Sequence, residues 1–391
     1  MNKIGPLARN RSLILAHLTP GAARSRKDIC AQTGLSPATV LRVTRQLLAG
    51  RILSESASVP RSGAGRPSST LEISGRAGLV LGASLLGPTL RVLLLNLRGE
   101  TLREYAAPIN LKRGPEGVLS PLKGLLRKAQ RELPPNAGPL RGVGLAVPGQ
   151  WDRKEGVSLT YPRLPDWKPV PLRALVEGWT GLPSRLVGFT PALAVAEQAA
   201  RAKDDFRDLA CVYADDHVGL GVLANGEALE GVSGNAGEMG HMTVQPEGPL
   251  CYCGNTGCLE MYSSCAAVLE QVRESEASRS RSGSAPRSFP DVAAMAGGGH
   301  AVAQRILGRA ATFLGIGVAS TLNLLNPQVV VLNGRFFDAG DLVLEPFRQS
   351  LQNRTLPNSL RPVAVERSTL GPKAGALGAG VLAIRQALKE L

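Results

Sequence analysis

A unit of consecutive strands occurs twice in this sequence, and this repeat limits the fold more than any other feature. In the first copy, apolar segments at 79–85 and 90–96 are strand candidates, and a turn at 96–100 leads into a third strand. In the second copy, residues 208–214 and 218–224 have the same pattern, followed by a turn at 225–227. Because helices follow each unit, the repeat predicts two related α/β lobes facing a cleft. A dinucleotide-binding fold would instead alternate strands and helices strictly.

The patterns in the rest of the chain indicate how it divides into domains. Residues 301–325 have a long Gly/Ala-rich helical pattern that Asn326-Pro327 ends, and 329–332 is a fully apolar strand. Residues 274–290 are rich in Ser and Arg and are expected to form a surface loop. We expect four parts: an N-terminal domain at 1–75, a first lobe at 76–190, a second lobe at 191–371, and a terminal helix at 372–391 that packs back on the first lobe.

The first 75 residues are the basic part of the chain. They contain eleven Lys and Arg against three Asp and Glu, a balance of +8 within a net charge of +14 for 391 residues. Three helices and a hairpin with strands at 51–55 and 70–74 are expected, the second helix capped by Ser25 and ended by Gly34. The apolar residues expected to be buried in the first two helices are Leu7, Ile14, Leu15, Leu18, Ile29 and Cys30. Such a basic head on a nearly neutral body favours a polyanionic partner.

The third helix of the head, at 38–49, has the pattern of a helix that reads DNA. Ser36 is its expected cap, and Pro37 takes the first helical position. One face is expected to be buried through Val40, Val43, Leu47 and Leu48. After a short helix and a Gly-containing turn, the other face would meet base edges in the major groove. The residues expected to contact bases are Ser36, Ala38, Thr39 and Arg42, with Arg42 as the candidate for guanine.

Further basic residues are expected to bind the DNA backbone and minor groove. Phosphate contacts are assigned to Arg45, Arg24, Arg26 and Lys27. Arg66, within Gly65-Arg66-Pro67, would enter a narrow minor groove as the tip of a wing. The alternatives are a flexible linker at 56–69 and a head that binds protein instead of DNA. Salt dependence distinguishes a DNA-binding head from a protein-binding head. Contact with six to ten phosphates would weaken DNA binding by roughly 10³–10⁵ between about 50 and 200 mM salt.

Composition excludes other classes of protein. Hydrophobic residues make up 43% and charged residues 19%, which are ordinary values for a folded globular chain. No apolar run approaches the roughly 18 to 20 residues that span a bilayer, and residues 1–18 lack the pattern of a secretory signal. We therefore expect a cytoplasmic protein. Six cysteines are too few for a disulfide scaffold of this length.

A cluster of metal-binding residue types gives the strongest chemical signal. The candidate ligands are His241, Cys251, Cys253 and Cys258. Three thiolates and one imidazole satisfy a tetrahedral Zn²⁺, and the glycines at 254 and 257 let the chain fold tightly around one ion. Four protein ligands leave no open position for an activated water, so the zinc is expected to be structural and a zinc hydrolase is excluded. The alternative is three unligated cysteines in a short polar loop.

The same residues carry a resemblance to a known family. The segments 237–241 (GEMGH) and 251–260 (CYCGNTGCLE) resemble the zinc signature of the ROK family, which unites repressors, open reading frames and sugar kinases. The similarity extends over 76–391, including 143–149 (VGLAVPG) and Gly378-Ala379. Residues 25–49 resemble the helix-turn-helix of winged-helix repressors. The resemblance implies a winged helix-turn-helix head fused to a two-lobed, actin-like (ribonuclease H-like) body, as in the family's transcriptional regulators.

The resemblance also implies a sugar site. Side chains at the positions of Glu238, His241 and Glu260 hold sugar hydroxyls in the family. A carboxylate can accept two hydroxyl protons, and a zinc-held imidazole presents its second nitrogen in a fixed orientation. The alternative for Glu238 and Glu260 is support of the zinc loop.

The sequence departs from the family's kinases at four places. Counting back from Glu197, the Asn-Asp pair that contains the catalytic base is replaced by Gly188 and Phe189. Phenylalanine cannot accept a proton, and loss of a general base removes about 10²–10⁴ in rate. The first phosphate turn reads Ser84-Leu85-Leu86-Gly87-Pro88, and Pro88 has no N–H to offer a phosphate. His217 stands where a glycine is expected, and Asn333-Gly334 replaces a glycine pair.

These observations predict a sequence-specific transcription regulator rather than an enzyme. The expected function is repression of carbohydrate-related genes, with a catalytically inactive body that senses a sugar or sugar phosphate. The expected partners are a double-stranded DNA operator and further copies of the chain, as a homodimer or homotetramer joined through the 301–325 helix and the zinc lobe. The alternatives are an active ROK sugar kinase and a DNA-binding regulator that needs no effector.

Overall fold

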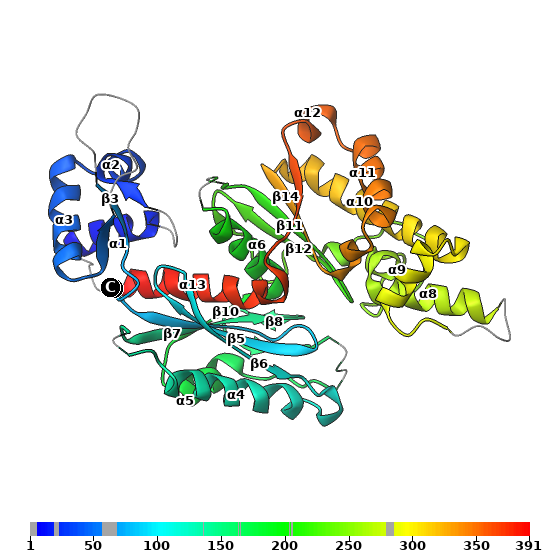
Figure 1. Cartoon of the computed structure of the whole chain (residues 1–391), viewed down its shortest axis with the longest axis horizontal. Helices are drawn as coiled ribbons and strands as arrows, with labels where there is room; N and C mark the ends of the chain where they lie inside the picture. The colour runs from blue at the N-terminus through cyan, green and yellow to red at the C-terminus, as the bar shows by residue number, and fades with distance from the viewer. Residues whose placement is uncertain are drawn as a thin grey trace. The chain divides into compact units, whose positions relative to one another are not determined.

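The computed structural model describes residues 6–18, 23–56, 69–135, 137–162, 164, 166–202, 204, 206–278 and 285–391. The chain forms two compact units (Figure 1). The first contains Met1–Asp205, Val232–Gly234 and Pro372–Leu391, and the second contains Phe206–Gly231 and Asn235–Gly371. The division falls after residue 205, so the helix at 189–200 belongs to the first unit, whereas the sequence expectation began the second lobe at 191.

The head at the start of the first unit consists of three helices and a small sheet. Its helices are α1 (Pro6–His17), α2 (Arg26–Thr33) and α3 (Pro37–Ala49), and its strands β1 (Arg24–Ser25), β2 (Leu53–Ser56) and β3 (Thr70–Ile73) pair in the order β1-β3-β2. Ser25 forms a capping box with Asp28 at the start of α2, and Gly34 ends α2 at φ 69°. The local signals in the sequence therefore set the limits of α2 and α3.

Three apolar side chains of the head are more exposed than the pattern predicts. Leu7 is 44% exposed, because the first turn of α1 extends beyond the core that Ile14, Leu15 and Leu18 form. Leu48 and Cys30 are half-buried at the margin of the same core. The other predicted core residues of the head are buried.

The body part of the first unit is built on a five-stranded sheet in the order β10-β7-β4-β5-β6. Strands β4, β5 and β6 form an antiparallel meander, and β7 and β10 continue the sheet in parallel. The strands are β4 (Leu79–Ser84), β5 (Thr89–Asn96), β6 (Thr101–Pro108), β7 (Leu140–Val147) and β10 (Ser184–Gly188), beside a small hairpin of β8 (Trp151–Asp152) and β9 (Val157–Ser158).

Helices cover both faces of this sheet (Figure 1). On one face α4 (Glu116–Arg131) and α5 (Leu172–Thr180) share a core with the alternating residues Leu79, Leu81 and Ala83. On the other face lie α6 (Phe189–Ala200) and the C-terminal helix α13 (Ala374–Glu390). A Cβ on Gly144 would lie 1.9 Å from the Ala379 carbonyl oxygen, so this glycine permits the close approach of α13 to the sheet.

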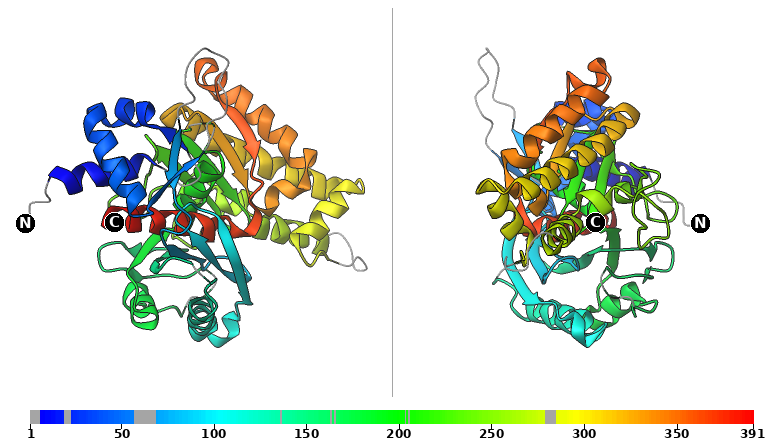
Figure 2. Two further views of the ribbon diagram at one scale, coloured as in Figure 1. Left: turned by 60° about the vertical axis from the view of Figure 1, so that its left-hand side comes forward. Right: turned by 90° about the vertical axis from the view of Figure 1, so that its right-hand side faces the viewer.

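The C-terminal helix also joins the body to the head (Figure 2). Ala383, Ile384, Ala387 and Leu388 of α13 belong to the same buried cluster as Ile14 and Leu15 of α1. The predicted return of the C-terminal segment to the first lobe is therefore accompanied by contact with the head, which the sequence did not indicate.

The second unit repeats the strand plan of the first. Its sheet has the order β13-β12-β11-β14-β15, with an antiparallel meander of β11, β12 and β13 extended in parallel by β14 and β15. The repeat predicted from the sequence is thus present in strand order and direction. The strands are β11 (Leu209–Ala214), β12 (Val218–Ala224), β13 (Glu227–Ala228), β14 (Val329–Asn333) and β15 (Ala364–Arg367).

Helix α10 (Ala301–Leu325) is the centre of the second core, with the bounds that the sequence predicts. It contacts α7 (Glu260–Ser263), α8 (Cys265–Ala277), α9 (Phe289–Gly297), α11 (Asp341–Arg354) and α12 (Pro357–Leu360). The predicted loop at 274–290 is shorter than expected, because α8 continues to Ala277 and a Ser288 capping box starts α9. The 3-10 helices are η1 (Leu111–Arg113), η2 (Met239–His241), η3 (Arg335–Ala339) and η4 (Gly371–Lys373). Within the described ranges, no helix is long and apolar enough to cross a membrane.

Candidate nucleic-acid interface and metal centre

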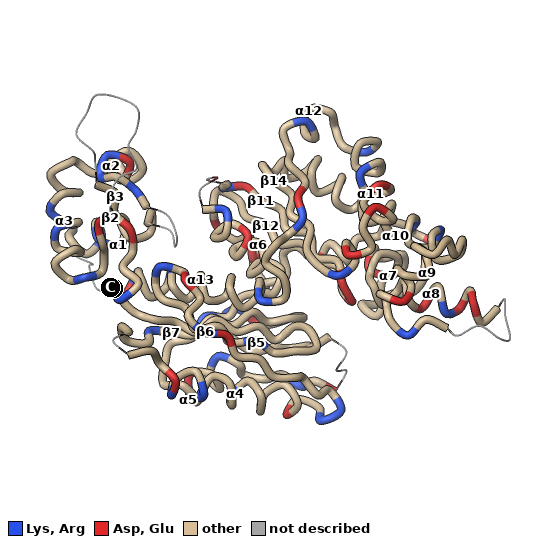
Figure 3. The backbone as a smooth tube through the Cα atoms, in the orientation of Figure 1, with Lys and Arg blue, Asp and Glu red and all other residues tan. Residues whose placement is uncertain are grey.

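Helix α3 presents most of the predicted DNA contacts on one side of the head. Ser36 caps the helix, since its Oγ accepts from the Thr39 N–H at 3.3 Å and lies 3.0 Å from Thr39 Oγ1. Ser36, Ala38, Arg42 and Arg45 are exposed, and Thr39 is half-buried. Neither arginine has an ion-pair partner among the described residues, and the basic positions along α3 are blue in Figure 3. The cap occupies Ser36, so the arginines are the stronger candidates for contacts with a ligand.

Arg26 does not fit its predicted role as a phosphate contact. Its guanidinium donates to Glu55 Oε1 at 2.7 Å, to Ser69 Oγ at 3.2 Å and to Thr44 Oγ1 at 3.3 Å. The hydrogen bond from Arg26 lowers the pKa of Glu55. Arg26 therefore ties α2 to α3 and to the small sheet, and Glu55 neutralises its charge. Arg66 at the predicted wing tip lies outside the described residues.

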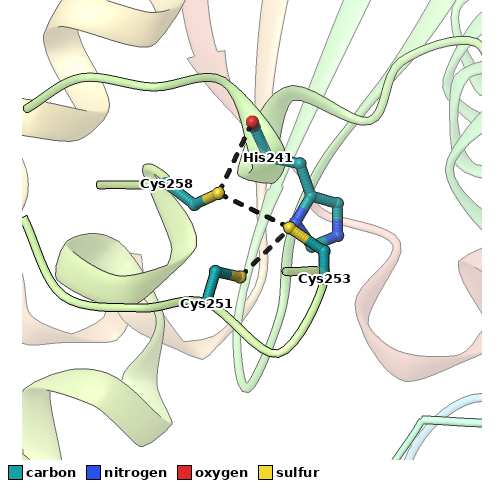
Figure 4. Close-up of side chains that lie close together, drawn as sticks. All are labelled: His241, Cys251, Cys253 and Cys258. Atoms are coloured by element: carbon teal, nitrogen blue, oxygen red, sulfur yellow. Dashed lines mark hydrogen bonds between the residues drawn. The ribbon is translucent and has the colours of Figure 1, made fainter. Parts of the chain in front are cut away.

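Four side chains converge at the predicted metal centre (Figure 4). The ligand atoms of His241, Cys251, Cys253 and Cys258 all lie within 4.8 Å of one another. η2 holds His241, and the bridges Thr243–Cys258 and Leu250–Thr256 fold the cysteine loop back on it. Gly257 has φ 69°, and a Cβ there would lie 1.6 Å from the Gln245 carbonyl oxygen, so only glycine allows this close turn.

The spacing of the four donors fits a tetrahedral ion. Zinc–sulfur bonds of about 2.3 Å place neighbouring donors of a tetrahedron about 3.8 Å apart. Cys253 Sγ lies 3.7 Å from Cys258 Sγ, and Cys251 Sγ lies 3.7 Å from His241 Nδ1. The donor set and its spacing therefore suit a divalent metal ion held by protein ligands alone.

The pKa values of two of the thiols favour a cation at this site, because burial makes these thiols harder to deprotonate. Burial raises the pKa of Cys258 to about 12 and also raises the pKa of Cys251. A hydrogen bond from the backbone of Asn255 lowers the pKa of Cys253. Burial therefore favours the protonated thiols of Cys251 and Cys258, whereas a bound divalent ion would stabilise all three thiolates.

The three residues expected to hold a sugar lie in one polar cluster of the second unit. His241 Nε2, the nitrogen on the far side of the ring from the cysteines, lies 3.8 Å from Glu238 Oε2. Burial raises the pKa of Glu238, and the charge of Glu260 raises it further. Glu260 is only 5% exposed, and the Val218 N–H donates to its Oε2 at 2.8 Å.

Two further members of this cluster were missed by sequence reasoning. His217 Nδ1 lies 3.3 Å from Glu260 Oε1, and the Tyr252 hydroxyl lies 3.4 Å from His241 Nε2. Burial would raise the pKa of Glu260, but hydrogen bonds from His217, Val218 and Tyr252 outweigh it and hold this pKa below its usual range. The sequence did contain a signal for His217, because it stands where the family's kinases are expected to have glycine. A histidine side chain at that position needs polar partners, and Glu260 is one of them.

Two of the positions that depart from the kinase pattern, Gly188 and Phe189, lie at the start of α6. Gly188 precedes α6 and Phe189 is the first residue of that helix. A Cβ on Gly375 would lie 2.7 Å from Phe189 Cε2 and 2.9 Å from Ser84 Oγ, so the phenyl ring packs on the start of α13. Glu197 is fully buried and pairs with Arg201. The first unit thus has an aromatic ring at the position that the resemblance assigns to the catalytic base of the family's kinases.

An ion pair that the sequence did not indicate joins two turns of the second unit. Arg335, just after Asn333-Gly334, donates from Nε to Asp215 Oδ1 at 2.9 Å and from Nη2 to Asp216 Oδ1 at 3.0 Å. The hydrogen bond with Asp215 raises the pKa of Arg335. The turn before His217 is thereby tied to the turn after β14.

Comparisons with known proteins agree with this architecture. The xylose repressor of Bacillus spizizenii (strain ATCC 23059 / NRRL B-14472 / W23) is 26% identical over 97% of this chain and 96% of its own length. The glucokinase of Halalkalibacterium halodurans is 29% identical over 78% of this chain and 95% of its own length. A crystal structure described as a ROK family transcriptional regulator, homologous to the E. coli MLC protein, matches with a TM-score of 0.80 and 25% identity, covering 98% of this chain and 97% of that one.

The family itself follows from the extent of the match. The sequence model described as the ROK family matches residues 85–386, which contain most of both lobes and the cysteine cluster. The regulator structure matches the chain over almost its whole length, including the head. On these grounds, together with the repeated sheet, the chain belongs to the ROK family.

Proposed function

We propose that this chain is a DNA-binding repressor of carbohydrate-related genes, with a head that reads an operator and a body that senses a sugar. The observation that carries the proposal is the capped helix α3, whose exposed side presents Arg42 and Arg45 in a head with a charge balance of +8. The name of the xylose repressor that matches along its whole length supports the assignment. Such a repressor acts in the cytoplasm.

The test of DNA binding starts with selection of a preferred operator from a random duplex library. Fluorescence anisotropy then measures affinity for that operator and for a scrambled duplex at several salt concentrations. We expect a steep loss of affinity, of roughly 10³–10⁵ between about 50 and 200 mM salt, if six to ten phosphates are contacted. Retention that salt does not change, or no enrichment of any duplex, would identify the head as a protein-interaction module.

The metal centre is proposed to hold a structural Zn²⁺. The four residues fill a tetrahedral shell, so the ion would fold the loop that positions Glu238 and His241. In this arrangement His241 would bind the metal through Nδ1 and present Nε2 to the polar cluster. The expected content is one zinc ion per chain, measured by mass spectrometry of the native protein.

The body is proposed to bind its sugar without phosphorylating it. Phe189 can take no proton from a sugar hydroxyl, and Pro88 offers no N–H to a phosphate. The buried contact between α13 and α1 is the proposed route by which the body influences the head. We further propose that the chain works as a homodimer or homotetramer, because helix-turn-helix heads read paired half-sites. Light scattering on the purified protein tests the number of copies.

A further inference from the structure

His217 is joined to Glu260 in a way that leaves one nitrogen of its ring unused. It ends the turn between β11 and β12, where its carbonyl oxygen accepts from the Asp215 N–H at 2.9 Å. Its Nδ1 lies 3.3 Å from Glu260 Oε1, and the next residue, Val218, donates its N–H to Glu260 Oε2 at 2.8 Å. One buried carboxylate therefore holds two successive residues of this turn.

Glu260 occupies one nitrogen of the His217 ring. Its Oε1 lies 3.3 Å from Nδ1, and its Oε2 accepts from the Val218 N–H at 2.8 Å. Nε2 is then the remaining nitrogen, and it is shielded from solvent without a hydrogen-bond partner among the described residues. A buried polar atom without a hydrogen bond destabilises the folded chain, which favours a partner from outside the chain.

The groups around His217 favour an uncharged partner with hydroxyl groups. Glu238 Oε2 lies 3.8 Å from His241 Nε2, in the same polar cluster as His217 and Glu260. Two carboxylates, two imidazoles and the Tyr252 hydroxyl can each accept from or donate to a sugar hydroxyl. The same two carboxylates repel a phosphate or another anion.

We propose that His217 is a specificity-determining residue of the effector site, with its Nε2 in contact with one hydroxyl of an unphosphorylated sugar. This inference rests on the proposed function, in which the body binds a sugar. In the family's kinases a glycine is expected at this position, and glycine has no side chain to make the contact. His217 thereby supplies a polar contact in a body where Gly188 and Phe189 have replaced an Asn-Asp pair.

The test is isothermal titration of the full-length, zinc-loaded protein with D-xylose, D-glucose, N-acetyl-D-glucosamine and glucose 6-phosphate. The variants are H217A, H217Q, E238A and, as a matched control, H17A on α1 of the head. We expect at least a tenfold loss of affinity for the best-bound sugar in H217A, partial recovery in H217Q, and no change in H17A. Glutamine keeps a polar side chain near Glu260, so H217Q also provides the measurement if H217A folds poorly.

Monodeoxy analogues of the best-bound sugar separate a direct contact from a structural effect. One analogue should bind wild type and H217A with equal affinity, because it lacks the hydroxyl that Nε2 meets. A purely structural role would weaken all analogues by the same factor and would overturn the inference. The melting temperature and zinc content of each variant are measured beside the titrations.

The remaining outcomes distinguish the inference from the function on which it rests. If H217A binds every sugar like wild type while E238A binds none, the sugar site exists without His217 and only the inference is wrong. If wild type binds none of the three free sugars, the proposed sugar-sensing function is wrong and the inference with it. Tighter binding of glucose 6-phosphate than of glucose would contradict the charge argument.

Discussion

At the scale of single residues, the head separates arginines that hold the fold from arginines that are free to bind. Arg26 is paired with Glu55 and bonded to Ser69 and Thr44, so its charge is used inside the head. Arg42 and Arg45 extend from the exposed side of α3. Type and position in the sequence do not distinguish these three side chains, but their surroundings do.

This difference predicts distinct effects on DNA binding. Replacing Arg42 by Ala should cost about 1–3 kcal/mol on the preferred operator and relax discrimination at one base pair. Replacing Arg45 by Ala should weaken binding to all duplexes alike and reduce the salt slope by about one. Anisotropy titrations on the operator and on single-base variants measure both effects. Equal losses on every duplex for R42A would contradict a role in reading bases.

At the scale of elements, small residues let helices approach the first sheet closely. Gly144 on β7 meets the backbone of α13, whereas Gly124 in α4 has open space around the position of its missing Cβ. Close packing of this kind leaves no room for one additional methyl group. The two glycines therefore form a matched pair with opposite expectations.

Alanine substitutions test this packing. Gly144→Ala should lower the free energy of unfolding by about 1–3 kcal/mol, because the new Cβ would meet the Ala379 carbonyl. Gly124→Ala should raise the free energy of unfolding by about 0.5–1 kcal/mol, because alanine stabilises an exposed position inside a helix more than glycine does. Urea unfolding with circular dichroism measures both values. A stabilised G144A would mean that α13 does not lie against β7.

The zinc loop is the second element with a sharp expectation. Cys253→Ala should remove the bound metal and lower the melting temperature, since structural zinc contributes about 10–16 kcal/mol in small peptides. Cys30→Ala, at the margin of the core of the head, should leave the metal content unchanged. Mass spectrometry of the native protein and calorimetry provide the two measurements. Full zinc occupancy in C253A would refute the ligand set.

At the scale of the whole molecule, the departures from the kinase pattern are spread over both units. The first unit contains Phe189 and Pro88, and the second contains His217 and Asn333-Gly334. These departures lie at separate positions of the chain. Restoring the kinase residue at one position therefore leaves the other departures unchanged. We therefore expect the glucokinase similarity to reflect a shared body rather than a shared activity.

Kinase assays test this distribution of changes. Wild type should convert glucose and ATP no faster than buffer in a coupled assay for ADP. The double variant Gly188→Asn with Phe189→Asp restores the expected base, yet it should remain inactive because Pro88, His217 and Asn333-Gly334 are unchanged. Glucose 6-phosphate formation by purified wild type would identify the chain as an active sugar kinase.

Much of the architecture was predictable from local features. Ser25, Gly34 and Ser36 cap helices through contacts with residues a few positions away. They therefore indicate where α2 begins and ends and where α3 begins, independently of the tertiary structure. The repeated strand pattern and the bounds of α10 follow from apolar periodicity, which depends on which side of an element is buried. The four metal-binding residues lie within 18 positions of sequence, so a short loop can bring them together.

Tertiary structure alone decided the contacts between distant positions. Arg26 meets Glu55 across 29 residues, His217 meets Glu260 across 43, and Arg335 meets Asp215 across 120. The contact of α13 with the head joins the two ends of the chain. Periodicity and capping describe one element at a time, whereas these pairs depend on strand register and on how closely helices pack. The sequence by itself therefore determined the elements and the chemical groups, and packing decided which of those groups are paired and which remain to bind a ligand.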